Sequence, residues 1–81
     1  MKTIERLKER FYSKDYYISF FPDHIYIINY KEVLDFSNTK IYLKFSNFNL
    51  KVYGNNFKII RKTNYEIDIK GFFNKVELVN E

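Results

Sequence analysis

His24 is the only histidine of the chain and the first residue to test for chemistry. It follows Pro22-Asp23, which predicts a turn, and it begins a predicted strand. A catalytic histidine needs an orienting carboxylate together with a nucleophile or a substrate beside it. Asp23 is adjacent in sequence, but consecutive residues of a strand point to opposite faces. We therefore interpret His24 as a surface or strand-edge residue.

Glu66 and Asp68 form the second candidate, because they share one face of a predicted strand. Paired carboxylates can bind a metal ion or divide the work of an acid and a base. Lys58, Lys70 and Lys75 are expected beside them, so cross-strand ion pairs are the simpler interpretation. The chain also contains no cysteine, no phosphate-binding loop and no nucleophile elbow. These observations predict a protein that is not an enzyme and has no catalytic residue, no cofactor and no metal.

Size and charge limit the remaining classes of function. A chain of 81 residues forms one domain, and a core of this size stabilises it by only a few kcal/mol. Residues 1–14 carry five basic and two acidic side chains, which is +3 of the total charge of +4. The rest of the chain is nearly neutral. No apolar run approaches the roughly 18 residues of a membrane-spanning helix, so a cytoplasmic location is the default expectation.

Residues 3–12 are predicted to form a short helix within a basic amphipathic segment at 1–14. Ile4, Leu7 and Phe11 fall on one helical face, and charged residues cover the other. A helix of this length is marginal on its own, so it must dock on something. Three modes stay open: the helix covers the sheet, makes peripheral contact with an anionic membrane, or inserts into a groove of a partner protein.

Residues 15–81 are predicted to be an all-β domain, because from Tyr16 the apolar period changes to two. Strands starting about every eight to ten residues are typical of an antiparallel meander. We expect about seven or eight short strands, folded as a small sandwich or a rolled sheet. The predicted strands are 16–21, 25–28, 32–36, 40–45, 49–53, 57–60, 65–70 and 74–79.

The second half of the chain predicts four consecutive hairpins that share one buried face. Val52 is expected opposite Phe57, around a Gly54-Asn55 turn whose residues tolerate positive φ. The other expected pairs are Phe45 with Leu50, Ile59 with Ile67, and Ile69 with Val76. The predicted buried face carries Ile41, Leu43, Phe45, Leu50, Val52, Phe57, Ile59, Ile67, Ile69, Val76 and Leu78.

The opposite face of this predicted sheet is mostly charged but also carries apolar side chains. A face turned wholly to solvent gives large apolar residues no reason to be there. The predicted contact residues are therefore Tyr42, Tyr53, Ile60 and Val79 on this face, with Phe48 at the tip of a predicted loop. Strand 74–79 is expected at the edge of the sheet, where unpaired backbone groups favour pairing between subunits and hence a homo-oligomer.

Three ordered segments carry a family resemblance. Residues 28–37 run Ile-Asn-Tyr-Lys-Glu-Val-Leu-Asp-Phe-Ser, residues 50–59 run Leu-Lys-Val-Tyr-Gly-Asn-Asn-Phe-Lys-Ile, which is similar to the pattern L-x-I-x-G-x-x-L-x-I, and residues 67–76 begin with I-x-I-x-G. Together they resemble the YabP/YqfC family of sporulation proteins, nearer to YqfC, over residues 24–79. Phe48 departs from the pattern, because the family usually has glycine there. A residue other than glycine is strained at positive φ, so the turn is expected to differ.

The resemblance implies a process rather than a mechanism. Members are small proteins made in the mother cell of a spore-forming bacterium, and they act in forespore development or in spore envelope assembly. YqfC is typically encoded next to the membrane protein YqfD, which implies a YqfD-like partner and a peripheral place at the forespore membrane. No catalytic residue is attributed to the family. We therefore predict a non-enzymatic protein that acts by protein–protein contacts.

The alternative is a small β-barrel that binds single-stranded nucleic acid. Such barrels combine aromatic platforms with a basic groove, and Tyr42, Tyr53 and several outward lysines supply both features. A nucleic-acid-binding domain should concentrate positive charge, whereas the body of this chain is nearly neutral. A salt-sensitive affinity for oligonucleotides would distinguish the two functions.

Overall fold

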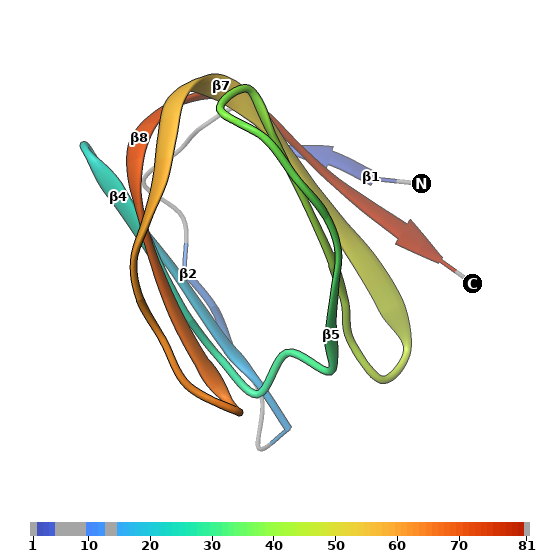
Figure 1. Ribbon diagram of the computed structural model, residues 1–81. Coiled ribbons are helices and arrows are strands. Elements are labelled where there is room, and N and C mark those ends of the chain that lie inside the picture. Colours follow the sequence, from blue (N-terminus) through green and yellow to red (C-terminus); the bar gives the residue numbers. More distant parts are fainter. Residues whose placement is uncertain (1, 5–9, 13–14, 81) are drawn as a thin grey trace.

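The computed structural model describes residues 2–4, 10–12 and 15–80, with side chains from residue 15 onward. These residues form one antiparallel sheet. Its eight strands are β1 (Lys2–Ile4), β2 (Arg10–Tyr12), β3 (Tyr17–Phe21), β4 (His24–Ile28), β5 (Glu32–Phe36), β6 (Lys40–Lys44), β7 (Phe48–Lys62) and β8 (Glu66–Asn80). The sheet curves around one interior, with β4 on one side and β5 on the other (Figure 1). The predicted all-β class is confirmed, and the arrangement is the rolled sheet.

β8 is the central strand of the sheet, whose order is β2-β3-β4-β8-β7-β6-β5. Along one edge it pairs with β7. Along its other edge the first half pairs with β4 and the second half with β1. The prediction that residues 74–79 form an edge strand is therefore wrong, because residues 76–78 have hydrogen-bonded neighbours on both sides.

β7 and β8 are each fifteen residues long and form one long hairpin where four short strands were predicted. Gly54-Asn55 lies inside β7, and the predicted turn from Gly71 to Asn74 lies inside β8, so neither turn exists. The other two predicted hairpins are present with a shifted register. The observed pairs are Leu43 with Leu50, Val52 with Val76, and Ile59 with Ile69.

Bulges explain why the predicted turns were wrong. The register of β7 and β8 shifts between Tyr53 and Gly54, between Asn55 and Lys58, and between Ile59 and Arg61. Each bulge inserts an extra residue and so reverses which side chains point inward. A hairpin turn makes the same change in the alternation of apolar residues. Bulges also bend a strand and increase its twist, which curls the sheet around its core.

Both glycines of the chain are required where the long hairpin bends. A Cβ atom on Gly54 would lie 1.9 Å from the carbonyl oxygen of Phe72, so the backbone of β8 leaves no room for a side chain. Gly71 has a φ of 151°, which L-residues rarely adopt, and a Cβ atom there would lie 2.6 Å from the ring of Phe57. The ring of Phe57 therefore packs tightly against both glycines.

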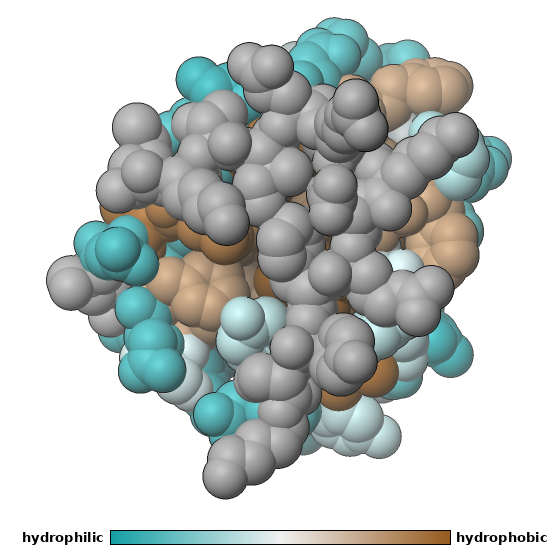
Figure 2. All heavy atoms as spheres, turned by 180° about the vertical axis from the view of Figure 1, so that it is seen from behind, coloured by the Kyte–Doolittle hydropathy of each residue, from teal (hydrophilic) through white to brown (hydrophobic). Residues whose placement is uncertain are grey.

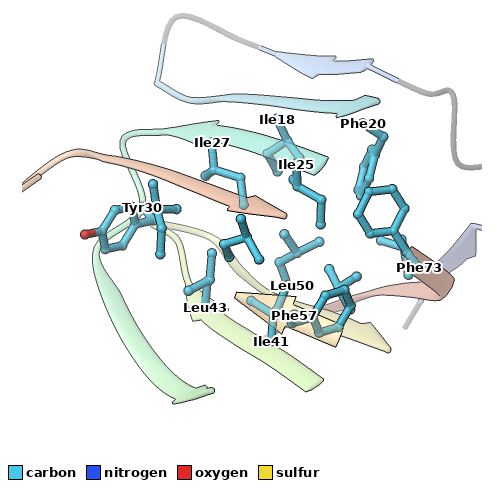
Figure 3. Close-up of a cluster of buried hydrophobic side chains, with 14 of the residues drawn as sticks. Ile18, Phe20, Ile25, Ile27, Tyr30, Ile41, Leu43, Leu50, Phe57 and Phe73 are labelled. Carbon is cyan, nitrogen blue, oxygen red and sulfur yellow. The ribbon is translucent and has the colours of Figure 1, made fainter. Parts of the chain in front are cut away.

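One hydrophobic core fills the interior of the curved sheet, as Figure 3 shows. The inward face predicted from the alternation is confirmed: nine of its eleven residues are buried, while Ile59 and Leu78 are partly buried and pack against the others. Burying each large aliphatic side chain contributes about 1.5–3 kcal/mol. The first half of the chain adds Ile18, Phe20, Ile25, Ile27 and Tyr30 to the same core.

Tyr30 fixes the connection that crosses from β4 to β5. Its ring is buried, and its hydroxyl donates a hydrogen bond of 2.7 Å to the carbonyl oxygen of Thr63 near the tip of the β7–β8 hairpin. Asn29, beside it, has a φ of 66°, a conformation that asparagine tolerates better than most residues. The backbone N–H of Lys31 donates to the carbonyl of Lys44. This connection thus joins the two halves of the rolled sheet.

The helix predicted over residues 3–12 is wrong at both of its ends. Residues 2–4 and 10–12 are strands, which pair with β8 and β3 respectively, and residues 5–9 lie outside the described residues. A short helix is marginal in isolation, whereas each strand gains backbone hydrogen bonds from a sheet that already exists. Within the described part of the chain, no helix is long and apolar enough to cross a membrane.

Candidate contact face

Four lysines and two tyrosines project from one outer face of the sheet. They alternate along β6, β7 and β8 with core residues, because successive residues of a strand point to opposite faces. The register places Tyr42 opposite Lys51, and Tyr53 between Lys40 and Lys75. We call this surface the lysine–tyrosine face. It consists of Lys40, Tyr42, Lys44, Lys51, Tyr53 and Lys75, together with Asn49, Glu77 and Val79.

The lysines of this face lie over the tyrosine rings. The Nζ atoms of Lys51 and Lys40 are 4.8 and 5.5 Å from the centre of the Tyr42 ring. The Nζ atom of Lys75 is 5.8 Å from the centre of the Tyr53 ring. Cation–π contacts at exposed sites contribute about 0.5–1 kcal/mol each. The rings are therefore partly desolvated and held in defined positions.

Two carboxylates partly offset the positive charge of the lysine–tyrosine face. Lys40 Nζ is 3.6 Å from Asp35 Oδ2, and Lys75 Nζ is 3.5 Å from Glu77 Oε1. The carboxylate of Glu77 is nearly buried, while that of Asp35 is mostly exposed. A third carboxylate, that of Glu32 on β5, lies opposite Lys44, so four lysines against three carboxylates leave this face and its β5 edge with a net charge of +1. It combines aromatic rings with a moderate positive charge.

Three of the five predicted contact residues lie together on this face. Tyr42, Tyr53 and Val79 are half-buried in neighbouring rows of β6, β7 and β8. The side-chain amide of Asn49 donates a hydrogen bond of 3.3 Å to the hydroxyl of Tyr42. The structure thus brings these three together as the alternation of residues indicates.

Ile60 and Phe48 lie elsewhere. Ile60 is the extra residue of the bulge between Ile59 and Arg61, and 57% of it is exposed. Phe48 is half-buried at the start of β7, where its ring stacks on Phe45 at 4.8 Å. The prediction of Phe48 at a loop tip is therefore wrong: the turn falls at Ser46 and Asn47, and the phenyl ring extends the core.

Other large hydrophobic residues also reach the surface, and Figure 2 shows hydrophobic and hydrophilic residues side by side on the rear of the molecule. Such side chains scattered singly are ordinary for a soluble fold, but Ile60 and Phe72 are more than half exposed. The exposed large hydrophobics are Phe21, Leu34, Ile60, Tyr65 and Phe72.

A second outer face, on β4 and the first half of β8, carries acidic groups and a tyrosine. Tyr26 donates a hydrogen bond from its hydroxyl to Glu66 Oε2, and this bond, together with burial, raises the pKa of Tyr26. Arg61 Nη2 lies 3.8 Å from Glu66 Oε1. One carboxylate oxygen of Asp68 is buried and has no hydrogen-bond partner among the described residues. We call Tyr26, Arg61, Glu66 and Asp68 the acid–tyrosine face.

The ion pairs predicted for Glu66 and Asp68 are wrong in their partners. Arg61, and not a lysine, lies beside Glu66, because the bulge at Ile60 places Arg61 opposite Asp68. Lys58 and Lys70 face each other instead, and Lys75 pairs with Glu77. No group of three or more histidine, aspartate and glutamate residues that could hold a metal ion occurs in the described residues.

His24 does contact Asp23, contrary to the expectation from strand geometry. Asp23 precedes the first residue of β4 and lies in a turn, so the alternation of a strand does not apply to it. His24 Nδ1 lies 3.0 Å from Asp23 Oδ1, and this hydrogen bond lowers the pKa of Asp23. The ring of His24 stacks on Phe21 with centres 4.3 Å apart. His24 is half-buried at the end of a strand, as predicted.

The lysines that cover the tyrosine rings were not among the five predicted contact residues, although outward lysines were part of the nucleic-acid alternative. A signal for them exists in the sequence, because Lys40, Tyr42 and Lys44 alternate on one strand. Lys51 and Tyr53 repeat the pattern on the next. Residues two apart on one strand share a face of the sheet, and on that face they come within reach of the residues opposite them on the neighbouring strand.

The sequence pattern of the YabP family matches residues 22–81. The chain belongs to the YabP family, which is associated with sporulation. The resemblance seen in the three ordered segments is confirmed, while the nearer likeness to YqfC stays a prediction. No curated protein and no solved structure gives a significant match.

Proposed function

We propose that this protein acts in sporulation as a non-enzymatic adaptor, working through protein–protein contacts in the cytoplasm of the mother cell. Membership of the YabP family supports the process. Forespore development and spore envelope assembly are the two stages at which such contacts would operate. A YqfD-like membrane protein is the proposed partner, as the resemblance implies.

The lysine–tyrosine face is the observation that carries the contact role. Tyrosine is enriched in the buried centres of protein interfaces, because it combines a large apolar ring with a polar end. Tyr42 and Tyr53 are held in place by flanking lysines, so little side-chain entropy remains to be lost on binding. Exposed Ile60 adds an apolar anchor outside the face.

The adaptor role is tested by capture of the purified protein on a detergent-solubilised YqfD-like membrane protein. Tyr53→Ser and Ile60→Ser are expected to weaken capture by about tenfold or more if each removes a dominant interface residue. Tyr65→Ser and Asn47→Ser are the controls, because both residues are exposed and lie outside every contact proposed for the protein. Full capture of both test variants, or equal loss in the controls, would contradict the proposed contact site.

Self-association is proposed as a second kind of contact. β5 is one end of the strand order, and Leu34 on it is 39% exposed. An edge strand with unpaired backbone groups can pair with its copy in a symmetric dimer. Sedimentation at high micromolar concentration measures this directly, and a strictly monomeric species would exclude it.

Binding of single-stranded nucleic acid is the second candidate, favoured by one observation. The lysine–tyrosine face combines two aromatic rings with four lysines, which are the ingredients of a single-strand surface. An oligonucleotide shift that weakens steeply with salt and is lost in Tyr42→Ser, without capture by the membrane protein, would replace the adaptor role by this one.

A further inference from the structure

A pocket of about 130 Å³ lies where the turn between β3 and β4 meets the bend of β7 and β8. Its lining residues are Asp23, Asn56, Lys58, Lys70, Gly71 and Phe72, none of which belongs to the lysine–tyrosine face. The backbone N–H of Gly71 donates a 2.9 Å hydrogen bond to the carbonyl of Asp23, which joins the turn to the bend. The pocket is therefore built from two fixed pieces of backbone.

Lys58 and Lys70 both line this pocket. Lys58 and Lys70 are directly opposite on β7 and β8, both are exposed, and neither forms an ion pair with a described residue. Like charges directly opposite on neighbouring strands repel each other. An anion bound between them would remove that repulsion.

Asp23 is the one carboxylate that lines the pocket, and it is already engaged. Its Oδ1 atom lies 3.0 Å from His24 Nδ1, and His24 lies opposite Lys70 in the next row of the sheet. The positive groups around the pocket thus outnumber the single carboxylate. The residues that line the pocket, two lysines and one aspartate, therefore carry a net charge of +1.

Phenylalanine supplies the apolar part of the same region. Phe72 lines the pocket and is 58% exposed. Phe21 lies opposite His24 in the neighbouring row and is 40% exposed. The Phe72 ring lies at the pocket with the lysine pair, while the Phe21 ring stacks on His24, and exposing either ring to water is unfavourable. A ligand with an apolar body would cover the phenyl rings while its anionic group met the lysines.

We propose that this pocket binds a molecule that carries a phosphate group on an apolar body. A phosphate carries up to two negative charges on several acceptor oxygens, so it can accept a hydrogen bond from each of two opposed ammonium groups. The pocket, of about 130 Å³, is lined mostly by apolar atoms, so it receives the apolar body while the phosphate group meets the ammonium groups of the exposed lysines. The molecule is a soluble organic phosphate or the headgroup of an anionic lipid.

The proposal is tested by titrating the ¹⁵N-labelled protein with inorganic phosphate and with phenyl phosphate, and by following backbone amide shifts. The backbone amide signals of residues 58 and 70–72 are expected to shift, and phenyl phosphate should bind more tightly than inorganic phosphate.

Lys58→Gln and Lys70→Gln should each weaken binding about tenfold, the effect of one charge-assisted hydrogen bond. Lys44→Gln removes the same charge elsewhere and should change affinity less than about twofold. Phe72→Ser should abolish the preference for phenyl phosphate.

Vesicles distinguish the two sources of phosphate. Sedimentation with phosphatidylcholine vesicles, with and without phosphatidylglycerol, assigns the site to lipid if the protein follows only the anionic vesicles and Lys58→Gln abolishes this. Binding of phenyl phosphate without vesicle binding assigns it to a soluble molecule. The proposal is overturned if no pocket amide moves with phenyl phosphate, or if the movement persists unchanged in the Lys58→Gln, Lys70→Gln double variant. These outcomes do not depend on capture by a membrane protein.

Discussion

The lysine–tyrosine face and the acid–tyrosine face differ in chemistry although both include residues of β7 and β8. Before the bend, β7 presents Lys51 and Tyr53 to solvent; after it, β7 presents Lys58 and Arg61. On the lysine–tyrosine face the tyrosine rings lie under ammonium groups. On the acid–tyrosine face a tyrosine hydroxyl binds a carboxylate. One hairpin thus carries two different surfaces, because its bulges change which residues point outward.

The bend of β7 and β8 at Gly54 and Gly71 separates the two faces. Substitutions at these two glycines should therefore have the largest effect on stability. Gly54→Ala places a methyl group against the Phe72 carbonyl oxygen, and Gly71→Ala also forces an L-residue to a φ of 151°. Each change is expected to lower the free energy of unfolding by roughly 3 kcal/mol, the upper end of overpacking costs. The melting temperature of a domain of this size should then fall by more than about 10 °C. Thermal and urea denaturation measure this.

Asn47→Ala is the control for the bend, because Asn47 lies in the exposed turn between β6 and β7. It should change stability by less than about 0.5 kcal/mol. If Gly54→Ala proved as stable as Asn47→Ala, then β7 and β8 would not approach each other as closely as the structure indicates.

The acid–tyrosine face should respond to alkaline pH. The hydrogen bond to Glu66 raises the pKa of Tyr26 above its ordinary value of 10.0, so the folded protein holds that proton more tightly than the unfolded chain. The stabilisation from this bond is complete below pH 10.0 and is lost as the pH rises through the raised pKa of the folded state. Tyrosinate absorbance and urea denaturation between neutral and alkaline pH measure the two effects.

Tyr26→Phe should remove this alkaline loss and lower the free energy of unfolding at neutral pH by about 1 kcal/mol, the net value of one hydrogen bond. Tyr65→Phe is the control, because Tyr65 is exposed at the hairpin tip. Identical alkaline profiles for wild type and Tyr26→Phe would show that the Tyr26–Glu66 bond does not set the pKa.

The smallest predicted effects come from two lysines whose removal should change the stability of the fold in opposite directions. Lys51→Gln removes a cation–π contact with Tyr42 and should destabilise the fold by about 0.5 kcal/mol. Lys70→Gln removes the repulsion from Lys58 and should stabilise it by a few tenths of a kcal/mol. Urea denaturation at low salt measures both, and the gain from Lys70→Gln should shrink at about 0.5 M salt, where exposed charges are screened. If both variants changed the free energy of unfolding in the same direction, then Lys51 and Lys70 would not differ in their surroundings as the structure indicates.

The alternation of residues predicted the core and the strands of residues 16–45 well, because a buried strand imposes a period of two whatever its neighbours are. It could not tell a bulge from a turn. Val52 and Phe57 both point inward in either case, and the difference depends on whether Phe72 lies beside Gly54. That contact is between residues far apart in sequence and leaves no local signal.

The candidate contact residues show the same limit. Tyr42, Tyr53 and Val79 were placed on one face correctly, since their strands are regular around them. Ile60 and Phe48 depend on a bulge and on a turn position, and both are set by pairing that no short window of sequence contains. The ends of the predicted helix became strands for a related reason, because Lys2–Ile4 and Arg10–Tyr12 take their backbone partners from β8 and β3.

The central position of β8 determines when the molecule can fold. β1, β4 and β7 all pair with this strand, yet it is the last of the eight to leave the ribosome. Until residues 66–80 are synthesised, β4 and β7 each lack the neighbour that joins the two halves of the sheet. Most contacts of β8 with β1 and β4 link residues distant in sequence, which slows folding. The sheet should therefore form only after β8 has left the ribosome, and a variant without residues 66–80 would lose the middle of the sheet.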